Sequence, residues 1–251
     1  LVGDASQVAY YRLSAAHPGM SKIEMLEIGL QELPGHPRLL VALGIVHARL
    51  NHPREARDYL MSAHQAAPQD VRTAGSVLHE LLHASAGDAV KDLVPQVRQI
   101  PNLLPGFWLD QGSMALHCKL GEEWAAFFIE EALNLIGQPW VDDTRAGVLL
   151  EAYELADEEK AGPLRAALEK RIREEAPASG AVQYIEAHRL NFEKNDSRGA
   201  LRLIKEAIRT ARRANDKGVL QRAEIVEQMF HGPPRMSEID RILGEMFPRG
   251  R

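Results

Sequence analysis

Residues 37–70, PRLLVALGIVHARLNHPREARDYLMSAHQAAPQD, decide the fold of this chain. Apolar residues recur at helical spacing until the Asn-His-Pro segment at 51–53 interrupts them, and a second amphipathic stretch then runs to Pro68. Gly44 and Ala56 are small at positions where two antiparallel helices must approach closely. Pro68 cannot donate a backbone hydrogen bond and therefore ends the second helix. The stretch predicts a helical hairpin.

The start of this hairpin recurs along the chain. A repeat length of about 34 residues leads from Pro37 to Val71 and Pro105, and back to Gly3. Near Asp143 the repeat spacing is shifted by a few residues, and a clearer repeat follows from residue 181. One phase held through these starts indicates an array of helical repeats.

Two residue pairs carry a family resemblance. Leu40 and Gly44 in the first hairpin are spaced as Trp108 and Gly112 are in a later one. Together with the small residues of the second helix and its terminal proline, this spacing resembles the tetratricopeptide repeat. The resemblance implies an all-α fold, a right-handed superhelical solenoid of antiparallel helix pairs. About six to seven units are expected, with the repeats degenerate in the second half of the chain.

The connections between predicted helices are short, and no Ser/Gly-rich linker suggests a second domain. We therefore expect a single solenoid domain over residues 1–251. The best repeats are expected at residues 3–36, 37–70, 105–138 and 181–214. A polar cap over the open end of the stack is expected at about residues 216–247.

Charge and composition exclude several classes of function. The net charge of −5 and the pI near 6.1 give no electrostatic reason to expect a nucleic-acid partner. No apolar run reaches the roughly 18 residues of a membrane span, so no membrane insertion is expected. Residues 1–7 lack the layout of a secretory signal, which favours a cytoplasmic location. The start at Leu1 rather than Met indicates a processed product or part of a longer protein and leaves an exported location open.

The resemblance implies a scaffold that binds a protein or peptide partner, without catalysis or cofactor. In such arrays the first helices of successive repeats line a concave groove that is free to bind ligands. The groove positions that carry over to this sequence are Arg38, Val41, Ile45, Arg49, Arg72, His79, Leu82, His83, Leu109, Ser113, His117 and Arg189. Glu151, Glu154 and Phe192 also fall at such positions. The early arginines could hold a carboxylate-bearing peptide bidentately, and a solvated face is the alternative.

The segment His79-Glu80-Leu81-Leu82-His83 matches a catalytic motif. In zinc proteases, H-E-x-x-H places two imidazoles one helical turn apart to hold zinc, and the glutamate polarises bound water. The extended pattern with a third histidine does not follow His83. The repeat register instead places His117 at the position equivalent to His83, so three histidines could converge. Because Cys118 is the sole cysteine, no disulfide and no cysteine-based metal site is expected.

Three functions therefore compete. The leading one is the peptide-binding scaffold, with the histidines as part of its groove. The second is a zinc-dependent peptidase or metal-binding protein that uses His79, His83 and His117. The third is a structural element for homo-oligomerisation. The aromatic residues between Trp108 and Phe128 recur at helical spacing and favour a core, whereas Trp140 follows a proline in a connection and is expected as an exposed anchor.

Overall fold

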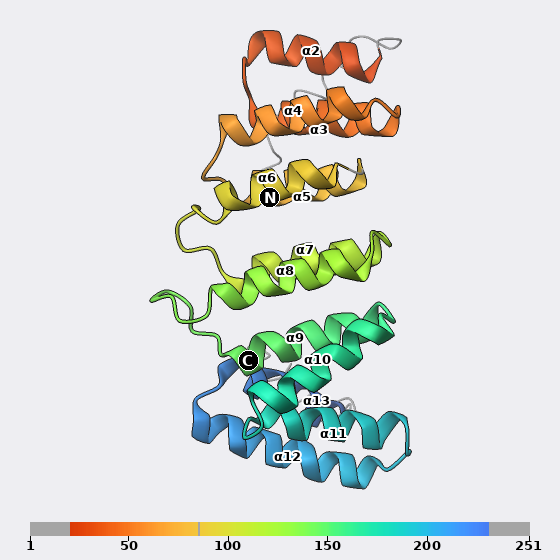
Figure 1. Ribbon diagram of the computed structural model, residues 1–251, viewed down its shortest axis with the longest axis vertical. Coiled ribbons are helices and arrows are strands. Elements are labelled where there is room, and N and C mark those ends of the chain that lie inside the picture. The colour runs from red at the N-terminus through yellow and green to blue at the C-terminus, as the bar shows by residue number, and fades with distance from the viewer. Residues whose placement is uncertain (1–20, 85, 231–251) are drawn as a thin grey trace, which may run out of the picture. The chain divides into compact units, whose positions relative to one another are not determined.

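The computed structural model describes residues 21–84 and 86–230, and every element in these ranges is an α-helix (Figure 1). No strand occurs in these ranges, which confirms the predicted all-α class. None of the described helices combines the length and apolar composition needed to cross a membrane. Residues 3–20 of the predicted repeat 3–36 and residues 231–247 of the predicted cap lie outside the described residues.

The chain divides into two compact units, Leu1–Leu135 and Ile136–Arg251, and each is described by itself. The single solenoid domain expected over residues 1–251 stays a prediction. The boundary lies in the connection from Asn134 to Arg145, beside the phase slip near Asp143, where the repeat spacing is lost.

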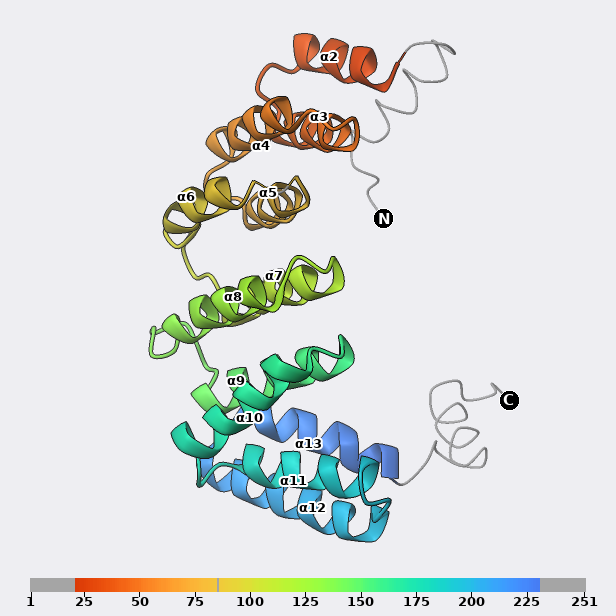
Figure 2. The ribbon, with the colours of Figure 1, turned by 45° about the vertical axis from the view of Figure 1, so that its right-hand side comes forward.

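Unit 1 consists of one helix followed by helical hairpins. Its described helices are α2 (Lys22–Glu32), α3 (Pro37–Arg49), α4 (Pro53–Ala66), α5 (Val71–His83), α6 (Gly87–Val97), α7 (Pro105–His117) and α8 (Glu122–Asn134). Within each hairpin α3 packs against α4, α5 against α6 and α7 against α8 (Figure 2). The first helices begin at Pro37, Val71 and Pro105, the starts given by the repeat of about 34 residues.

Local chemistry explains these helix boundaries. Pro37 and Pro105 stand in the first turn of α3 and α7, where a missing N–H costs nothing. The carboxylate of Asp70 caps α5 by accepting hydrogen bonds from the backbone N–H of Thr73 at 3.0 Å and from its hydroxyl at 2.6 Å. Asn51 adopts a φ of 60° between α3 and α4, a left-handed conformation that asparagine tolerates better than most residues.

Close helix contacts and aromatic packing build the core of unit 1. A Cβ atom on Gly44 would lie 2.6 Å from Cγ of the fully buried Leu60 and 3.3 Å from the carbonyl oxygen of Ala56. The prediction that Gly44 permits close approach of two helices is therefore confirmed. Trp108 and Phe128 are both fully buried, with stacked rings whose centroids are 5.9 Å apart. These two aromatic side chains belong to the core, as the spacing predicted.

Unit 2 contains the remaining helices. They are α9 (Arg145–Glu158), α10 (Gly162–Glu175), α11 (Gly180–Phe192), α12 (Ser197–Ala214) and α13 (Lys217–Phe230). The buried carboxylate of Asp216 ties the beginnings of two of them together, because it accepts hydrogen bonds from the Thr144 hydroxyl at 2.8 Å and the Val219 N–H at 3.1 Å. The helix α13, which begins the predicted cap, thus packs on α9, α11 and α12.

One buried histidine makes the stability of unit 1 depend on pH. His64 in α4 is 1% exposed, and its Nδ1 has no hydrogen-bond partner among the described residues. Burial lowers the pKa of His64. Below a pH of about 6.5, the ordinary histidine pKa, the unfolded chain therefore takes up a proton that the folded chain resists, and stability falls as the pH drops.

We expect the urea midpoint of unit 1 to decrease between pH 7.5 and pH 5.5, and His64→Leu to make this decrease smaller. Circular dichroism during urea unfolding at each pH measures the effect. His52→Leu, which changes an exposed histidine on the same hairpin, should leave the pH dependence as it is. An unchanged slope in His64→Leu would contradict the assignment.

Candidate functional site

The predicted groove residues of unit 1 lie on α3, α5 and α7 or directly at their ends, with unequal access to solvent. Leu82 and Leu109 are only 3% and 1% exposed, so they belong to the core and offer no surface to a partner. The prediction fails for these two leucines because burial between packed helices removes an apolar side chain from water, which is more favourable than exposure in a groove. The exposed members of the set are Arg38, Arg49, Arg72, His83 and His117, and the half-buried ones are Val41, Ile45, His79 and Ser113.

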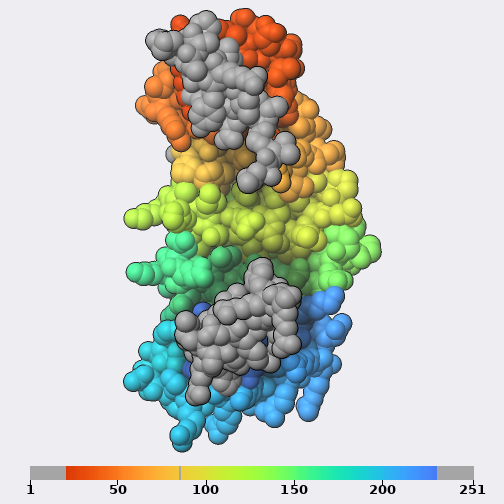
Figure 3. All heavy atoms as spheres, turned by 180° about the vertical axis from the view of Figure 1, so that it is seen from behind, coloured from red at the N-terminus to blue at the C-terminus, as the bar shows by residue number. Residues whose placement is uncertain are grey.

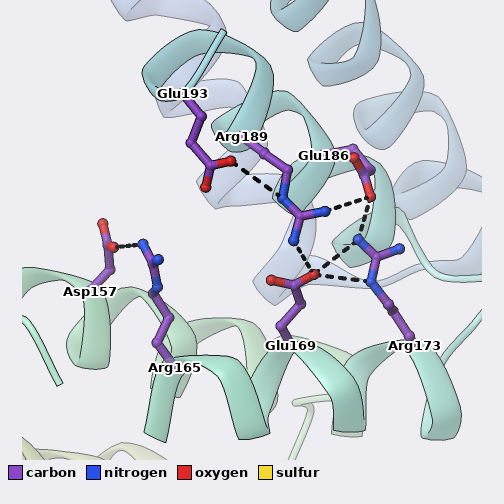
Figure 4. Close-up of polar contacts among 7 residues, drawn as sticks. All are labelled: Asp157, Arg165, Glu169, Arg173, Glu186, Arg189 and Glu193. Carbon is purple, nitrogen blue, oxygen red and sulfur yellow. Dashed lines mark hydrogen bonds and ion pairs between the residues drawn. The ribbon is translucent and has the colours of Figure 1, made fainter. Parts of the chain in front are cut away.

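The arginine predicted for the groove in unit 2 is engaged within the protein. Arg189 in α11 contacts Glu169 of α10 with an Nη2–Oε1 distance of 2.6 Å, and lies 3.7 Å from Glu186 and 3.9 Å from Glu193 (Figure 4). Arg173 joins the same two helices through Glu169 and Glu186. Arg189 therefore takes part in a network that fastens α10 to α11, a role that the repeat register did not predict.

A cavity of about 1110 Å³ lies within unit 2, lined mainly by α9, α11 and α13. Its lining includes large apolar side chains that are exposed to solvent: Phe192 is 72% exposed, Met229 75% and Ile225 49%. Apolar groups of this size are normally buried, and a group of them around a cavity marks a surface for binding. Glu151, Glu154 and Phe192, which the repeat register assigned to the groove, all line this cavity.

Polar side chains that line the cavity form a connected set of hydrogen bonds and ion pairs. The Tyr184 hydroxyl donates a hydrogen bond to Glu154, and Arg222 of α13 donates from Nε to the other oxygen of Glu154 at 2.7 Å. Arg222 also pairs with Glu151 at 2.9 Å. Burial, followed by the charge of Glu154, raises the pKa of Tyr184, so that the hydroxyl keeps its proton and remains a donor. These contacts join α9, α11 and α13.

The charge of the cavity lining is predominantly negative. It contains five carboxylates, at Asp143, Glu151, Glu154, Asp157 and Glu158, against the basic side chains of Lys217 and Arg222 and the imidazole of His188. Because Asp143 and Glu158 are exposed and have no ion-pair partner among the described residues, their part of the lining favours a cationic group.

The basic residues of α12 lie outside this cavity. Figure 3 shows the opposite face from Figure 1, with residues of unit 2 in cyan and blue. Lys205 lies 4.0 Å from Glu227, and Arg212 contacts Glu224 at 2.7 Å. Carboxylates of α13 thus partly neutralise the basic side chains of α12, which include Arg202, Lys205, Arg209, Arg212 and Arg213, and this favours a solvated face over a nucleic-acid surface.

The histidines of the H-E-x-x-H segment meet a different third residue from the one predicted. His79 and His83 lie with their rings at 4.5 Å between centroids, and the Sγ of Cys118 is 3.1 Å from Nε2 of His83. One ligand atom from each of His79, His83 and Cys118 lies within 4.8 Å of the others. His117 is not in this group, because α7 ends at His117 and the turn that follows directs the next side chain toward α5. The structure thus brings the Cys118 thiol, and not the predicted His117, beside the two histidines.

A scan against protein-family models found no match to this chain, and neither did a search among curated proteins. The support for a function therefore comes from the cavity of unit 2 and from the group of His79, His83 and Cys118.

Proposed function

We propose that this chain is a tetratricopeptide-like array that binds a segment of a partner protein, and that the partner segment docks in the cavity of unit 2. The observation that carries the proposal is the exposure of Phe192, Ile225 and Met229 around one cavity. These side chains come from α11 and α13, which α12 separates in the sequence, and the packing of α13 beside α11 brings them together. Exposed apolar residues on rigid helices form the usual groove for an amphipathic partner segment.

The chemistry of the rim specifies the partner segment further. An amphipathic helix with apolar residues at i, i+3 or i+4 would place them against Phe192 and Met229. Lysine or arginine residues beside this apolar stripe would face Asp143 and Glu158, whose charges have no described partner. The proposed ligand is therefore a basic amphipathic peptide segment. The proposed surface therefore includes Glu151, Glu154 and Phe192, which the repeat register assigned to the groove, and leaves out the arginines of unit 1.

The proposal is tested with peptides selected against the full chain. A phage-displayed library of random peptides is panned on the purified protein, and the enriched sequences are synthesised with a fluorescent label. We expect these peptides to combine helical apolar spacing with lysine or arginine. The double variant Phe192→Asp/Met229→Asp should weaken binding roughly 100-fold or more, because charge at two central apolar contacts costs several kcal/mol. Fluorescence anisotropy measures the dissociation constants.

Matched variants separate this site from the alternatives. Leu50→Asp places the same charge on a leucine of unit 1 that is 51% exposed, and it should leave the affinity unchanged. Loss of binding in Arg49→Glu or Arg72→Glu, with Phe192→Asp/Met229→Asp unaffected, would assign the partner to the groove of unit 1 instead. Sedimentation that shows a dimer of the wild type, lost in the double variant, would make a second copy of the chain the occupant.

A further inference from the structure

The ends of two helices bring together three metal-ligating side chains in unit 1. His79 and His83 stand one turn apart on α5, and His83 is the last residue of that helix. Cys118 is the residue that caps the C-terminus of α7, with its N–H bonded to the carbonyl groups of Met114 and Leu116. The helices α5 and α7 belong to successive hairpins that contact each other. The group therefore lies at a junction between two hairpins.

The spacing of the ligand atoms fits one tetrahedral metal ion. Zinc binds imidazole nitrogen at about 2.0 to 2.1 Å and thiolate sulfur at about 2.3 Å, so neighbouring ligand atoms of a tetrahedral site are about 3.3 to 3.6 Å apart. The distance from Sγ of Cys118 to Nε2 of His83 is 3.1 Å, and all three ligand atoms lie within 4.8 Å of one another. Small side-chain rotations are enough to reach the tetrahedral distances.

The surroundings of His79 also suit a metal ligand. Its Nδ1 is buried and has no hydrogen-bond partner among the described residues, so this nitrogen has a lone pair to offer. The carboxylate of Glu80 lies 3.8 Å from Nε2 of the same ring. A carboxylate on the far nitrogen of a ligating histidine fixes its tautomer and orientation. At 3.8 Å this contact is longer than a hydrogen bond, and a small rotation of the Glu80 side chain would bring its carboxylate to the distance at which it orients His79.

Electrostatics favours a cation at the same point. The C-terminal ends of helices carry partial negative charge on their unpaired carbonyl groups. Both α5, which ends at His83, and α7, which ends at His117, direct this end toward the side-chain group. A divalent cation between them is stabilised by both helix termini, by the thiolate and by Glu80.

We propose that His79, His83 and Cys118 bind one zinc ion that ties α5 to α7 and leaves its fourth position to water. Two neutral imidazoles and one thiolate form a donor set that suits zinc, and binding releases the proton of the Cys118 thiol. In this arrangement Glu80 is a positioning residue. The proposal is independent of the partner-binding site, which lies in unit 2.

Cobalt(II) can replace zinc at such a site, and its absorption spectrum reports both thiolate ligation and tetrahedral geometry. The full chain is treated with a chelator, dialysed and titrated with cobalt(II) under reducing conditions. We expect a thiolate-to-cobalt charge-transfer band in the near ultraviolet and intense visible bands of tetrahedral cobalt, both abolished by zinc. Because Cys118 is the only cysteine of the chain, the charge-transfer band can report no other thiol.

Variants test each ligand against a close control. Cys118→Ser should abolish the charge-transfer band, and His83→Ala should weaken cobalt and zinc binding at least about 100-fold, since removing a ligand costs more than the 10- to 100-fold loss that follows removal of a second-shell partner. Glu80→Gln should weaken binding about 10-fold while the tetrahedral spectrum remains. His117→Ala changes the exposed histidine next to Cys118, outside the group, and should bind as the wild type does. Circular dichroism of each variant confirms that the helices are intact.

A second measurement needs no variant. Zinc should slow the alkylation of Cys118 by iodoacetamide in the wild-type protein, as followed by mass spectrometry, and the chelator should restore the rate. The proposal is overturned if zinc leaves the rate unchanged, or if cobalt gives no charge-transfer band. It is also overturned if the band survives in His79→Ala/His83→Ala, which would indicate binding to the thiol alone, or if His117→Ala loses affinity as His83→Ala does.

Discussion

Replacing Trp108 with alanine is expected to destabilise unit 1 by about 3 to 5 kcal/mol, the cost of removing a large aromatic side chain from a packed core. The indole is fully buried, stacks on Phe128 and meets the ring of Phe107 edge-on at 5.0 Å between centroids. Helix α7 and helix α8 pack on each other around it. The cavity left by alanine would span both helices, and they cannot close it without separating from their neighbours.

Urea unfolding followed by circular dichroism measures the loss, and hydrogen exchange of peptides from residues 105–134 locates it. The control is Trp140→Ala, which removes the same side chain from a position that is 40% exposed in unit 2. We expect this variant to lose much less stability. Equal losses in the two variants would show that burial of Trp108 does not hold the α7–α8 hairpin together.

Gly180→Ala is expected to destabilise unit 2 by about 2 to 3 kcal/mol through overpacking. Gly180 opens α11, and a Cβ atom there would lie 2.6 Å from the carbonyl oxygen of Ala207 and 3.1 Å from Cγ1 of Val219. The first of these atoms belongs to the backbone of α12, so it cannot rotate away. The helices α11 and α12 would have to move apart, and the contact of Val219 in α13 would be lost with them.

The first residue of α10 provides a matched control. Gly162 has the same place in its helix as Gly180, yet nothing lies within 4 Å of a Cβ atom built on it. Gly162→Ala should therefore be neutral or stabilising by about 0.4 to 1 kcal/mol, because alanine restricts the unfolded chain. Thermal unfolding of the two variants compares them. A melting temperature that falls equally in both would contradict the steric explanation.

Much of the helical framework could be predicted from local signals. Pro37 and Pro105 suit the first turn of a helix, and apolar residues at helical spacing follow each of them. These signals act within one hairpin, so the sequence alone gave the all-α class and the helix starts. The same signals could not divide the chain into units, because the loss of phase near Asp143 leaves the hydrophobic pattern helical on both sides.

The candidate sites depended on contacts between hairpins. Gly44 and Gly112 have the same place in the repeat, yet a Cβ atom on Gly44 would lie 2.6 Å from Leu60, whereas the nearest atom to one on Gly112 is 3.5 Å away. The repeat register predicted that both glycines allow close helix packing. It could not predict at which of them an added Cβ atom would clash more severely, because that distance depends on which side chain of the second helix lies opposite.

Helical hairpins, and the placement of His79 and His83 on one face of a helix, follow from the spacing of residues along the chain. The residue that these histidines contact depends on how α5 and α7 pack. The difference between His117 and Cys118 is one position, and it is set by the end of α7 and the left-handed Lys119 that follows, at a φ of 56°. Likewise Phe192 and Met229 meet at one cavity only because α13 packs beside α11. Periodicity fixes which face of a helix is apolar, but the angle and distance between packed helices fix which side chains become neighbours.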